Sequence, residues 1–257
     1  MTIDIRTLIL IIGIAHLIQM FVFTVQYYAN RTISGPGWWL IWSATEVLGF
    51  VLILMRSVPS LLQFVIVTQN IIILSGTIFA YIGIMRFFKK QINSKLIYLL
   101  FTSYIILHIY FTFISNSIEI RTLLLDISLS IVAFITAISI FKNKIPSIAS
   151  TAIFNVMIFS IHGSIFVFRT VAILMGESIT EVFSLSFFNL IQYFDALIVG
   201  LLWTFGFIMM LNQKLNAEIL EAKSHFELIF NTSPDAAVIS QLRDGKFVDC
   251  NEGFTKI

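Results

Sequence analysis

The sequence predicts an all-α membrane protein: a bundle of seven transmembrane helices, then an amphipathic coiled-coil linker helix and the first part of an α/β domain. Hydrophobic residues make up 58% of the chain and the mean hydropathy is +0.95, both far above the values of soluble proteins. Seven apolar runs, each near the roughly 20 residues that a bilayer core requires, fill residues 5–211. Residues 1–211 hold 18 of the 30 charged side chains, and the last 46 residues hold the other 12.

The composition excludes several function classes. A net charge of +2 argues against a nucleic-acid partner. A single cysteine, Cys250, permits no intrachain disulfide and no cysteine cluster for a metal, and we interpret it as a small strand residue. The seventh apolar run has no lysine before Lys214 that could form a retinal Schiff base. His16, His108 and His162 each stand alone on a helix, without the spacing of metal ligands, so we expect no metal site and no catalytic residue.

The seven predicted spans are separated by helix breakers and charges. They cover approximately residues 5–28, 38–58, 61–85, 95–115, 122–141, 148–174 and 184–211, within a membrane domain of residues 1–211. The first run is too long for the apolar part of a signal peptide and no cleavage site follows it, so we count it as a span. A Ser-Gly-Pro-Gly sequence closes the first loop, Pro59 the second and Pro146 the fifth, whereas charged residues mark the third and fourth.

Basic residues are distributed unequally between the loops. If the N-terminus is outside, the inner loops carry seven basic residues and the outer loops carry two, Arg56 and Arg121, besides Arg6 near the N-terminus. The seven inner residues are Arg31, Arg86, Lys89, Lys90, Lys95, Lys142 and Lys144. The last outer loop carries the acidic residues Glu177 and Glu181 instead. Because lysine and arginine favour the cytoplasmic side, this pattern predicts an outside N-terminus and a cytoplasmic tail.

Nearly every predicted span carries polar residues on one face. Asn155, His162 and Arg169 recur every seven residues in the sixth span, which places them on one side of the helix. The third span repeats the pattern with Gln63, Asn70 and Thr77. The polar residues of the other spans are His16, Gln19 and Gln26 in the first; Ser43 and Glu46 in the second; Tyr104, His108 and Thr112 in the fourth; Asp126 and Ser130 in the fifth; and Asn189, Gln192 and Asp195 in the seventh. We therefore predict a polar bundle interior and an apolar surface toward the lipid.

Two interpretations of these polar residues remain open. A charge inside a bilayer costs several kcal/mol, so Arg169 is expected to pair with Asp126 or Asp195. In the first interpretation, the polar residues are interhelical hydrogen bonds and one ion pair that hold the bundle together. In the second, they form an outward-facing pocket for a small polar or charged ligand. The candidate ligand-binding residues are His108, Asp126, Arg169, Asp195, Gln192, Glu46, Asn70 and His162.

After the seventh span, residues 212–230 predict a continuous amphipathic signalling helix. Apolar residues at a strict 4-3-4-3 spacing form the a/d seam of a coiled coil, here called the dimer seam: Leu215, Ile219, Ala222, Phe226 and Ile229. Charged residues between them keep the opposite face in water. Two heptads are too short to be stable alone, so we predict a homodimer supported by the membrane spans and the following domain. The alternative is a single helix that packs on its own domain.

The tail combines short elements in a characteristic order. It begins with an amphipathic helix that contains Phe226, Ile229 and Phe230, followed by Ser233-Pro234-Asp235. Two strands, at 237–242 and 246–250, are then predicted on either side of a turn at Asp244-Gly245. A last helix begins at Asn251, and its Phe254 is predicted to pack inward. In this order, residues 224–257 resemble the start of a PAS sensory domain. The resemblance covers only the N-terminal part of such a domain, which lacks enough core to fold alone, so we expect a fragment or a truncated product. The cofactor, if any, stays unknown.

The membrane region supplies a second resemblance. Residues 35–63 and 69–88 combine a Gly-Trp start of a span, a short Arg-Pro turn and a basic-aromatic end of a span. They are similar to the multi-span sensor regions of bacterial PAS-containing diguanylate cyclases and sensor histidine kinases. The resemblance implies a receptor in the bacterial inner membrane that passes a small-molecule or membrane cue to the PAS domain and an output domain, with a diguanylate cyclase favoured. The competing class is a transporter or channel with a regulatory PAS domain, although no convincing internal repeat is visible.

Overall fold

The computed structural model describes residues 4–177, 183 and 186–255. They form two compact units, residues 1–208 and 209–257, and the boundary between them falls within one helix. The predicted outer-loop residue Glu181 and the first two residues of the predicted span 184–211 lie outside the described part of the chain.

Seven helices in the described residues are long and apolar enough to cross a membrane, which confirms an all-α, multi-pass membrane protein. They are α1 (Ile5–Ala29), α2 (Pro36–Met55), α3 (Leu62–Phe87), α4 (Ser94–Phe113), α5 (Ile118–Asn143), α6 (Ala149–Leu174) and α7 (Phe187–Thr232). Short 3-10 turns at Pro59–Leu61 and Pro146–Ile148 precede α3 and α6. Proline suits the start of a helix, because the backbone N–H that it lacks would have no partner within the helix there. The predicted spans agree with these bounds to within a few residues, except that α5 begins four residues earlier and α7 continues far beyond residue 211.

Local signals in the sequence explain where several helices begin. Asn93 and Ser117 cap α4 and α5 by accepting from the backbone N–H three residues later. Asp4 caps α1 by accepting from Arg6 N, and its carboxylate also accepts from Thr7 Oγ1. These bonds to Thr7 and Arg6 lower the pKa of Asp4. Gly35 precedes α2 with φ +122°, a backbone conformation that favours glycine.

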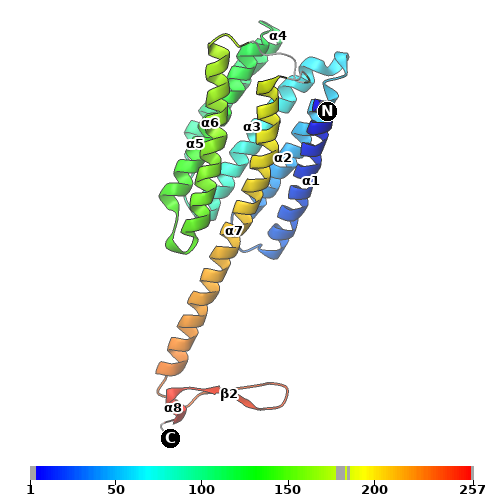
Figure 1. Ribbon diagram of the computed structural model, residues 1–257. Helices are drawn as coiled ribbons and strands as arrows, with labels where there is room; N and C mark the ends of the chain where they lie inside the picture. The colour runs from blue at the N-terminus through cyan, green and yellow to red at the C-terminus, as the bar shows by residue number, and fades with distance from the viewer. Residues whose placement is uncertain (1–3, 178–182, 184–185, 256–257) are drawn as a thin grey trace. The chain divides into compact units, whose positions relative to one another are not determined.

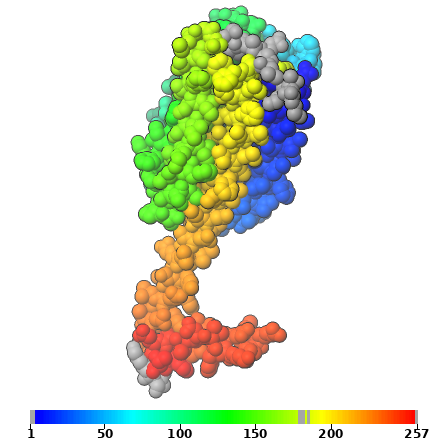
Figure 2. Space-filling view, viewed as in Figure 1, coloured from blue at the N-terminus to red at the C-terminus, as the bar shows by residue number. Residues whose placement is uncertain are grey.

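The helices of the first unit form one bundle (Figure 1). Helix α2 packs along both α1 and α3, while α5 packs against α6, α3 and α4. Helix α7 lies between α6 and α1 on the face shown in Figure 2, and its Trp203 packs on Phe159 of α6 and on Trp42 of α2. Helix α4 is peripheral, because its buried residues are limited to Tyr104, His108 and Thr112.

Polar side chains do lie in the interior of the bundle, as their spacing predicts, among a larger set of buried hydrophobic residues. Buried polar residues occur on all seven helices, and apolar side chains such as Phe21, Phe64 and Leu99 are exposed on the outer surface. One member of the predicted stripes is misplaced: Gln63 is exposed, whereas Gln69 is buried. The reason is that Gln63 lies in the first turn of α3, where its side chain faces away from the other helices.

The second unit contains the end of α7, a β-hairpin and a short helix. Strands β1 (Val238–Ser240) and β2 (Phe247–Cys250) pair antiparallel, with a register shift between Ile239 and Ser240. Both strands are shorter than predicted. Gly245 has φ +70° in the predicted turn, as this connection requires.

Asn251 organises this unit. Its side chain is fully buried, and its Oδ1 accepts from the backbone N–H groups of Ala237 and Phe254, so it caps α8 (Glu252–Thr255) as predicted. Phe254 was predicted to pack inward, but 43% of it is exposed. A two-stranded sheet and a four-residue helix supply too little surface to cover its ring.

The linker region 212–230 is helical throughout, because it belongs to α7. Within the single chain, the dimer seam has no covering partner: Ile219, Phe226 and Ile229 are each more than half exposed. Leu220 and Leu228, outside the seam, are exposed to a similar degree.

Candidate ligand-binding cavity

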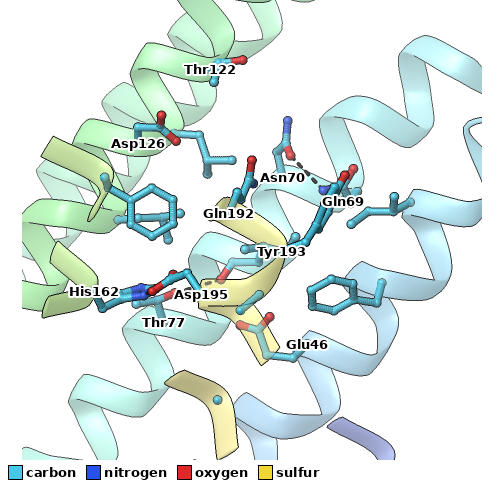
Figure 3. Close-up of a pocket in the computed structure, with 18 of the residues that line it drawn as sticks. Glu46, Gln69, Asn70, Thr77, Thr122, Asp126, His162, Gln192, Tyr193 and Asp195 are labelled. Atoms are coloured by element: carbon cyan, nitrogen blue, oxygen red, sulfur yellow. Dashed lines mark hydrogen bonds and ion pairs between the residues drawn. The ribbon is translucent and has the colours of Figure 1, made fainter. Parts of the chain in front are cut away.

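A cavity of about 160 Å³ lies inside the bundle (Figure 3). Six of the seven helices line it, and α4 contributes none of the described lining residues. Seven of the eight predicted ligand-binding residues lie in its wall: Glu46, Asn70, Asp126, His162, Arg169, Gln192 and Asp195. A volume of this size accommodates several water molecules or one small ring, so the space suits a small ligand.

His108 is the predicted site residue that does not line the cavity. It is fully buried on α4, a helix that packs against α3 and α5 and contributes none of the described lining residues. Its Nε2 accepts from Asn70 Nδ2 at 3.2 Å, and Asn70 Oδ1 accepts from Gln69 Nε2 at 3.0 Å. Asn70 and Gln69 both line the cavity. His108 therefore contacts the cavity wall through Asn70 rather than lining the cavity, and its predicted role in ligand binding stays a prediction.

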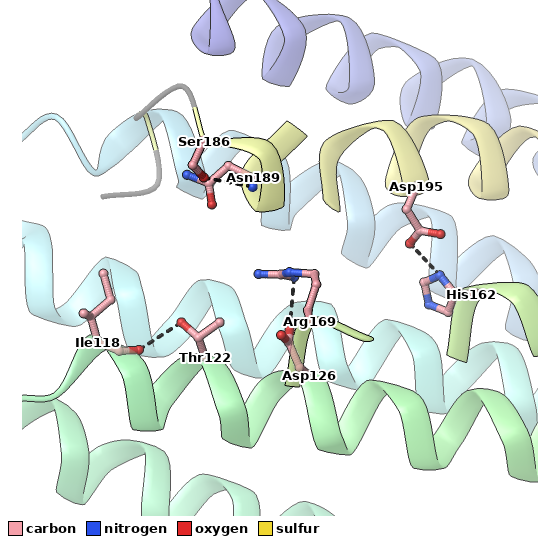
Figure 4. A network of polar contacts seen from close by, with 8 residues as sticks. All are labelled: Ile118, Thr122, Asp126, His162, Arg169, Ser186, Asn189 and Asp195. Carbon is pink, nitrogen blue, oxygen red and sulfur yellow. Dashed lines mark hydrogen bonds and ion pairs between the residues drawn. The ribbon is translucent and has the colours of Figure 1, made fainter. Parts of the chain in front are cut away.

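Arg169 of α6 forms an ion pair with Asp126 of α5 (Figure 4). Arg169 Nη1 donates to Asp126 Oδ1 at 3.1 Å, and both side chains are almost completely buried. This contact confirms Asp126, one of the two predicted partners. Asp126 Oδ2 and Arg169 Nε have no hydrogen-bond partner among the described residues. The pair thus leaves one acceptor and one donor available to a molecule in the cavity.

The other predicted partner, Asp195, binds a different residue. Asp195 Oδ2 on α7 lies 2.7 Å from His162 Nδ1 on α6 (Figure 4). The imidazole also packs edge-on against Trp203, 4.8 Å between ring centroids. Asp195 Oδ1 has no hydrogen-bond partner among the described residues. This contact joins α6 to α7 at the cavity wall.

Two arginines that the sequence analysis assigned to outer loops also line the cavity. Arg56 directly follows α2, and Arg121 is in the first turn of α5. Arg121 Nη1 donates to the Phe111 carbonyl and to Asn116 Oδ1, whereas Arg56 Nε has no hydrogen-bond partner among the described residues. Their position in loops predicted to be outside, where basic residues are uncommon, was the sequence signal that could have identified them.

The surroundings of Arg56 change the pKa of its side chain. Burial lowers the pKa of Arg56 to about 10; Tyr193 opposes the shift, and the nearby Arg121 guanidinium adds to it. At neutral pH the side chain still carries its charge. No carboxylate of the described residues lies within 4.0 Å of either Arg56 or Arg121. This end of the cavity is therefore cationic.

The opposite end of the cavity is aromatic. His16, Trp42, Trp203 and Glu46 line it. The His16 ring stacks on Phe50, with 5.2 Å between centroids, and its Nδ1 lies 2.8 Å from Gln19 Oε1. Glu46 and Arg56 are ten residues apart on the same stretch of chain, which corresponds to about 15 Å along a helix. The acidic and cationic ends are thus well separated.

The described residues contain no group of three or more His, Cys, Asp or Glu side chains that could hold a metal ion. Comparison with models of known protein families, with curated proteins and with solved structures yields no match to this chain.

Proposed function

We propose that this chain is the receptor region of a membrane signalling protein, which binds a small polar or charged molecule in the cavity and transmits binding through α7. One observation carries the proposal. Helix α7 lines the cavity with residues from Asn189 to Trp203, and it continues as a single helix to Thr232. Its 46 residues are more than twice the roughly 20 that a bilayer needs. The helix that contacts the ligand is therefore the helix that leaves the membrane.

A ligand shifts a protein between two states only if it binds one of them better. A molecule in the cavity that packs against the α7 residues lining it, from Asn189 to Trp203, acts directly on α7. A small displacement of Asp195 or Trp203 then passes along the continuous helix α7 to the exposed dimer seam. In this proposal, two chains associate through the seam, and binding changes the rotation or sliding of α7 in the dimer.

The proposal also assigns the tail to a PAS domain in the cytoplasm of a bacterium, with the N-terminus on the outer face of the inner membrane. The hairpin, its Asp-Gly turn and the capping residue Asn251 occur in the order that this assignment requires. An output domain, a diguanylate cyclase or a histidine kinase, then follows the PAS domain. The loop charges support the orientation.

Disulfide crosslinking in native membranes tests the proposed signalling path. In a Cys250→Ser background, single cysteines at positions 215, 219 and 222 should crosslink between chains, whereas cysteines at 216 and 220 should not. Asp195→Asn, which alters the cavity wall of α7, should change the crosslinking rate at position 215 severalfold at an unchanged protein level.

Arg86→Gln is the matched control, because Arg86 is exposed and does not line the cavity. It should leave the crosslinking rate unchanged. Uniform crosslinking at all positions, or none, would refute the dimer seam. Identical rates in the parent and in folded Asp195→Asn would refute transmission from the cavity to α7.

A further inference from the structure

We propose that the cavity binds a small organic anion, a carboxylate attached to a short apolar or aromatic body, with Arg56 and Arg121 as the carboxylate-binding residues. This inference rests on the proposed receptor function and names its ligand class. It follows from two properties of the cavity: an uncompensated positive charge at one end and an apolar wall of limited volume.

The first property is the distribution of charges. Of the three arginines that line the cavity, Arg169 is neutralised by Asp126. Asp195 binds His162, and Glu46 lies about 15 Å along the chain from Arg56. Arg56 and Arg121 have no carboxylate within 4.0 Å among the described residues. Because a buried charge without a counter-ion is unfavourable, an anion at this position would be stabilised.

The donors are also arranged for a carboxylate. Arg121 is held by the Phe111 carbonyl and Asn116, which fixes its guanidinium at the cavity wall. Arg56 retains a buried Nε–H without a partner among the described residues. Guanidinium groups bind carboxylates with two parallel, charge-assisted hydrogen bonds. Arg56 and Arg121 both line the cavity and influence each other electrostatically, so a carboxylate placed between them would be attracted by both.

The second property is the apolar wall beside the arginines. It is lined by Phe50, Ile53, Ile66, Ile73, Leu125 and Leu129. Such a wall favours a hydrocarbon or aromatic body over a second charged group. The volume of about 160 Å³ is close to that of an apolar cavity known to hold benzene, about 150 Å³. A single ring with one carboxylate fits these limits, and a nucleotide exceeds them.

Equilibrium binding of radiolabelled benzoate to the full chain in nanodiscs of uncharged lipid tests the inference. Benzamide, its neutral counterpart of the same shape, and inorganic phosphate serve as competitors. We expect saturable benzoate binding, with benzamide and phosphate each competing at least about tenfold more weakly than unlabelled benzoate. Arg56→Gln should weaken benzoate binding by at least about tenfold, and Arg56→Lys by less.

Arg86→Gln again provides the matched control and should bind benzoate like the parent. Thermal unfolding of each variant verifies that it is folded. If Arg56→Gln does not fold, Arg121→Gln provides a second test of the same charge. Equal competition by benzamide, or normal binding to folded Arg56→Gln, would overturn the anion assignment. Equal competition by phosphate would contradict the claim that the ligand has an apolar or aromatic body. The absence of saturable benzoate binding would overturn the whole inference. The crosslinking experiment tests the receptor function separately, because it uses no ligand. A failure to bind benzoate therefore leaves its result unchanged.

Discussion

His162 on α6 and Asp195 on α7 are joined by a hydrogen bond of 2.7 Å between Nδ1 and Oδ2, inside a bundle whose polar residues surround a cavity. Both side chains are buried within the bundle and line the cavity. The contact fixes α7 to a neighbouring helix at the level where α7 lines the cavity. Any molecule that competes for either side chain therefore acts on the position of α7.

A double-mutant cycle measures this contact. Asp195→Asn and His162→Gln should each lower the free energy of unfolding by about 1–3 kcal/mol, because each leaves a buried polar partner less well satisfied. The double variant should be less destabilised than the sum of the two single variants, by about 0.5–3 kcal/mol. Thermal or denaturant unfolding of the purified protein in detergent provides the values. Strict additivity would show that the two side chains do not interact.

The ion pair between Arg169 and Asp126 should be more sensitive to the loss of one partner. Asp126→Asn leaves a buried guanidinium without its counter-ion, and we expect a destabilisation of about 3–5 kcal/mol. The exposed pair Lys223–Glu227 on α7 is the matched control, and Glu227→Gln should change stability by less than about 0.5 kcal/mol. Equal effects of the two substitutions would mean that water reaches the inner pair.

The spans and the polar interior could be predicted because both depend on periodicity along single helices. Seven apolar runs between breakers define the spans, and the seven-residue spacing of Asn155, His162 and Arg169 places all three on the buried face of α6. Gln63 of α3 is an exception, because it follows the spacing but is exposed. In the first turn of a helix, the same spacing continues although no neighbouring helix faces it.

The contents of the cavity wall depend on contacts between helices, which a single sequence does not contain. From the sequence, Asp126 and Asp195 are equivalent partners for Arg169; in the structure Arg169 binds Asp126, and His162 binds Asp195. His108 does face the bundle interior, as its spacing predicts, but it contacts Asn70 and does not line the cavity, a distinction that periodicity along α4 alone does not reveal. Arg56 and Arg121 were treated as loop charges, since the inward course of a long side chain at a helix end leaves no periodic signal.

Gly83 on α3 marks a close approach to α2. A Cβ atom at this position would lie 2.5 Å from Trp39 Cδ1 and Nε1. Trp39 cannot move aside, because its ring stacks on Phe207 with 4.6 Å between centroids. We expect Gly83→Ala to destabilise the bundle by about 1–3 kcal/mol through overpacking.

Gly13→Ala on α1 is the control for the intrinsic effect of alanine in a helix. The nearest atom to its added Cβ is Phe50 Cβ at 3.7 Å, an ordinary contact. This variant should be neutral or stabilised by up to about 1 kcal/mol. Thermal unfolding of the two variants side by side decides the matter, and equal stability would contradict the close packing of α2 on α3.

The proposed orientation predicts the behaviour of reporter fusions. Green fluorescent protein fused after Lys90 or after Gln213 should fluoresce, whereas alkaline phosphatase at the same positions should be inactive. After Ser57, the phosphatase should be active, because the α2–α3 connection is assigned to the outside. The physical reason is the excess of basic residues in the loops assigned to the cytoplasm. The reverse pattern at Gln213 would place the tail outside and exclude the proposed cytoplasmic output.

We expect the side chain of Asn251 to keep the hairpin of the second unit ordered. Its Oδ1 accepts from Ala237 N and Phe254 N, both at 2.9 Å, and its Nδ2 donates to the carbonyls of Asp235 and Ser233. Asn251→Ala removes all four bonds and should increase amide hydrogen exchange at Ala237 and Phe254 by about tenfold or more, since loss of a cap alone costs about 1 kcal/mol. Asn251→Asp retains the acceptor and loses the two donated bonds, so exchange should rise to an intermediate level. If Asn251→Ala exchanges like the parent, the hairpin is held by contacts other than Asn251.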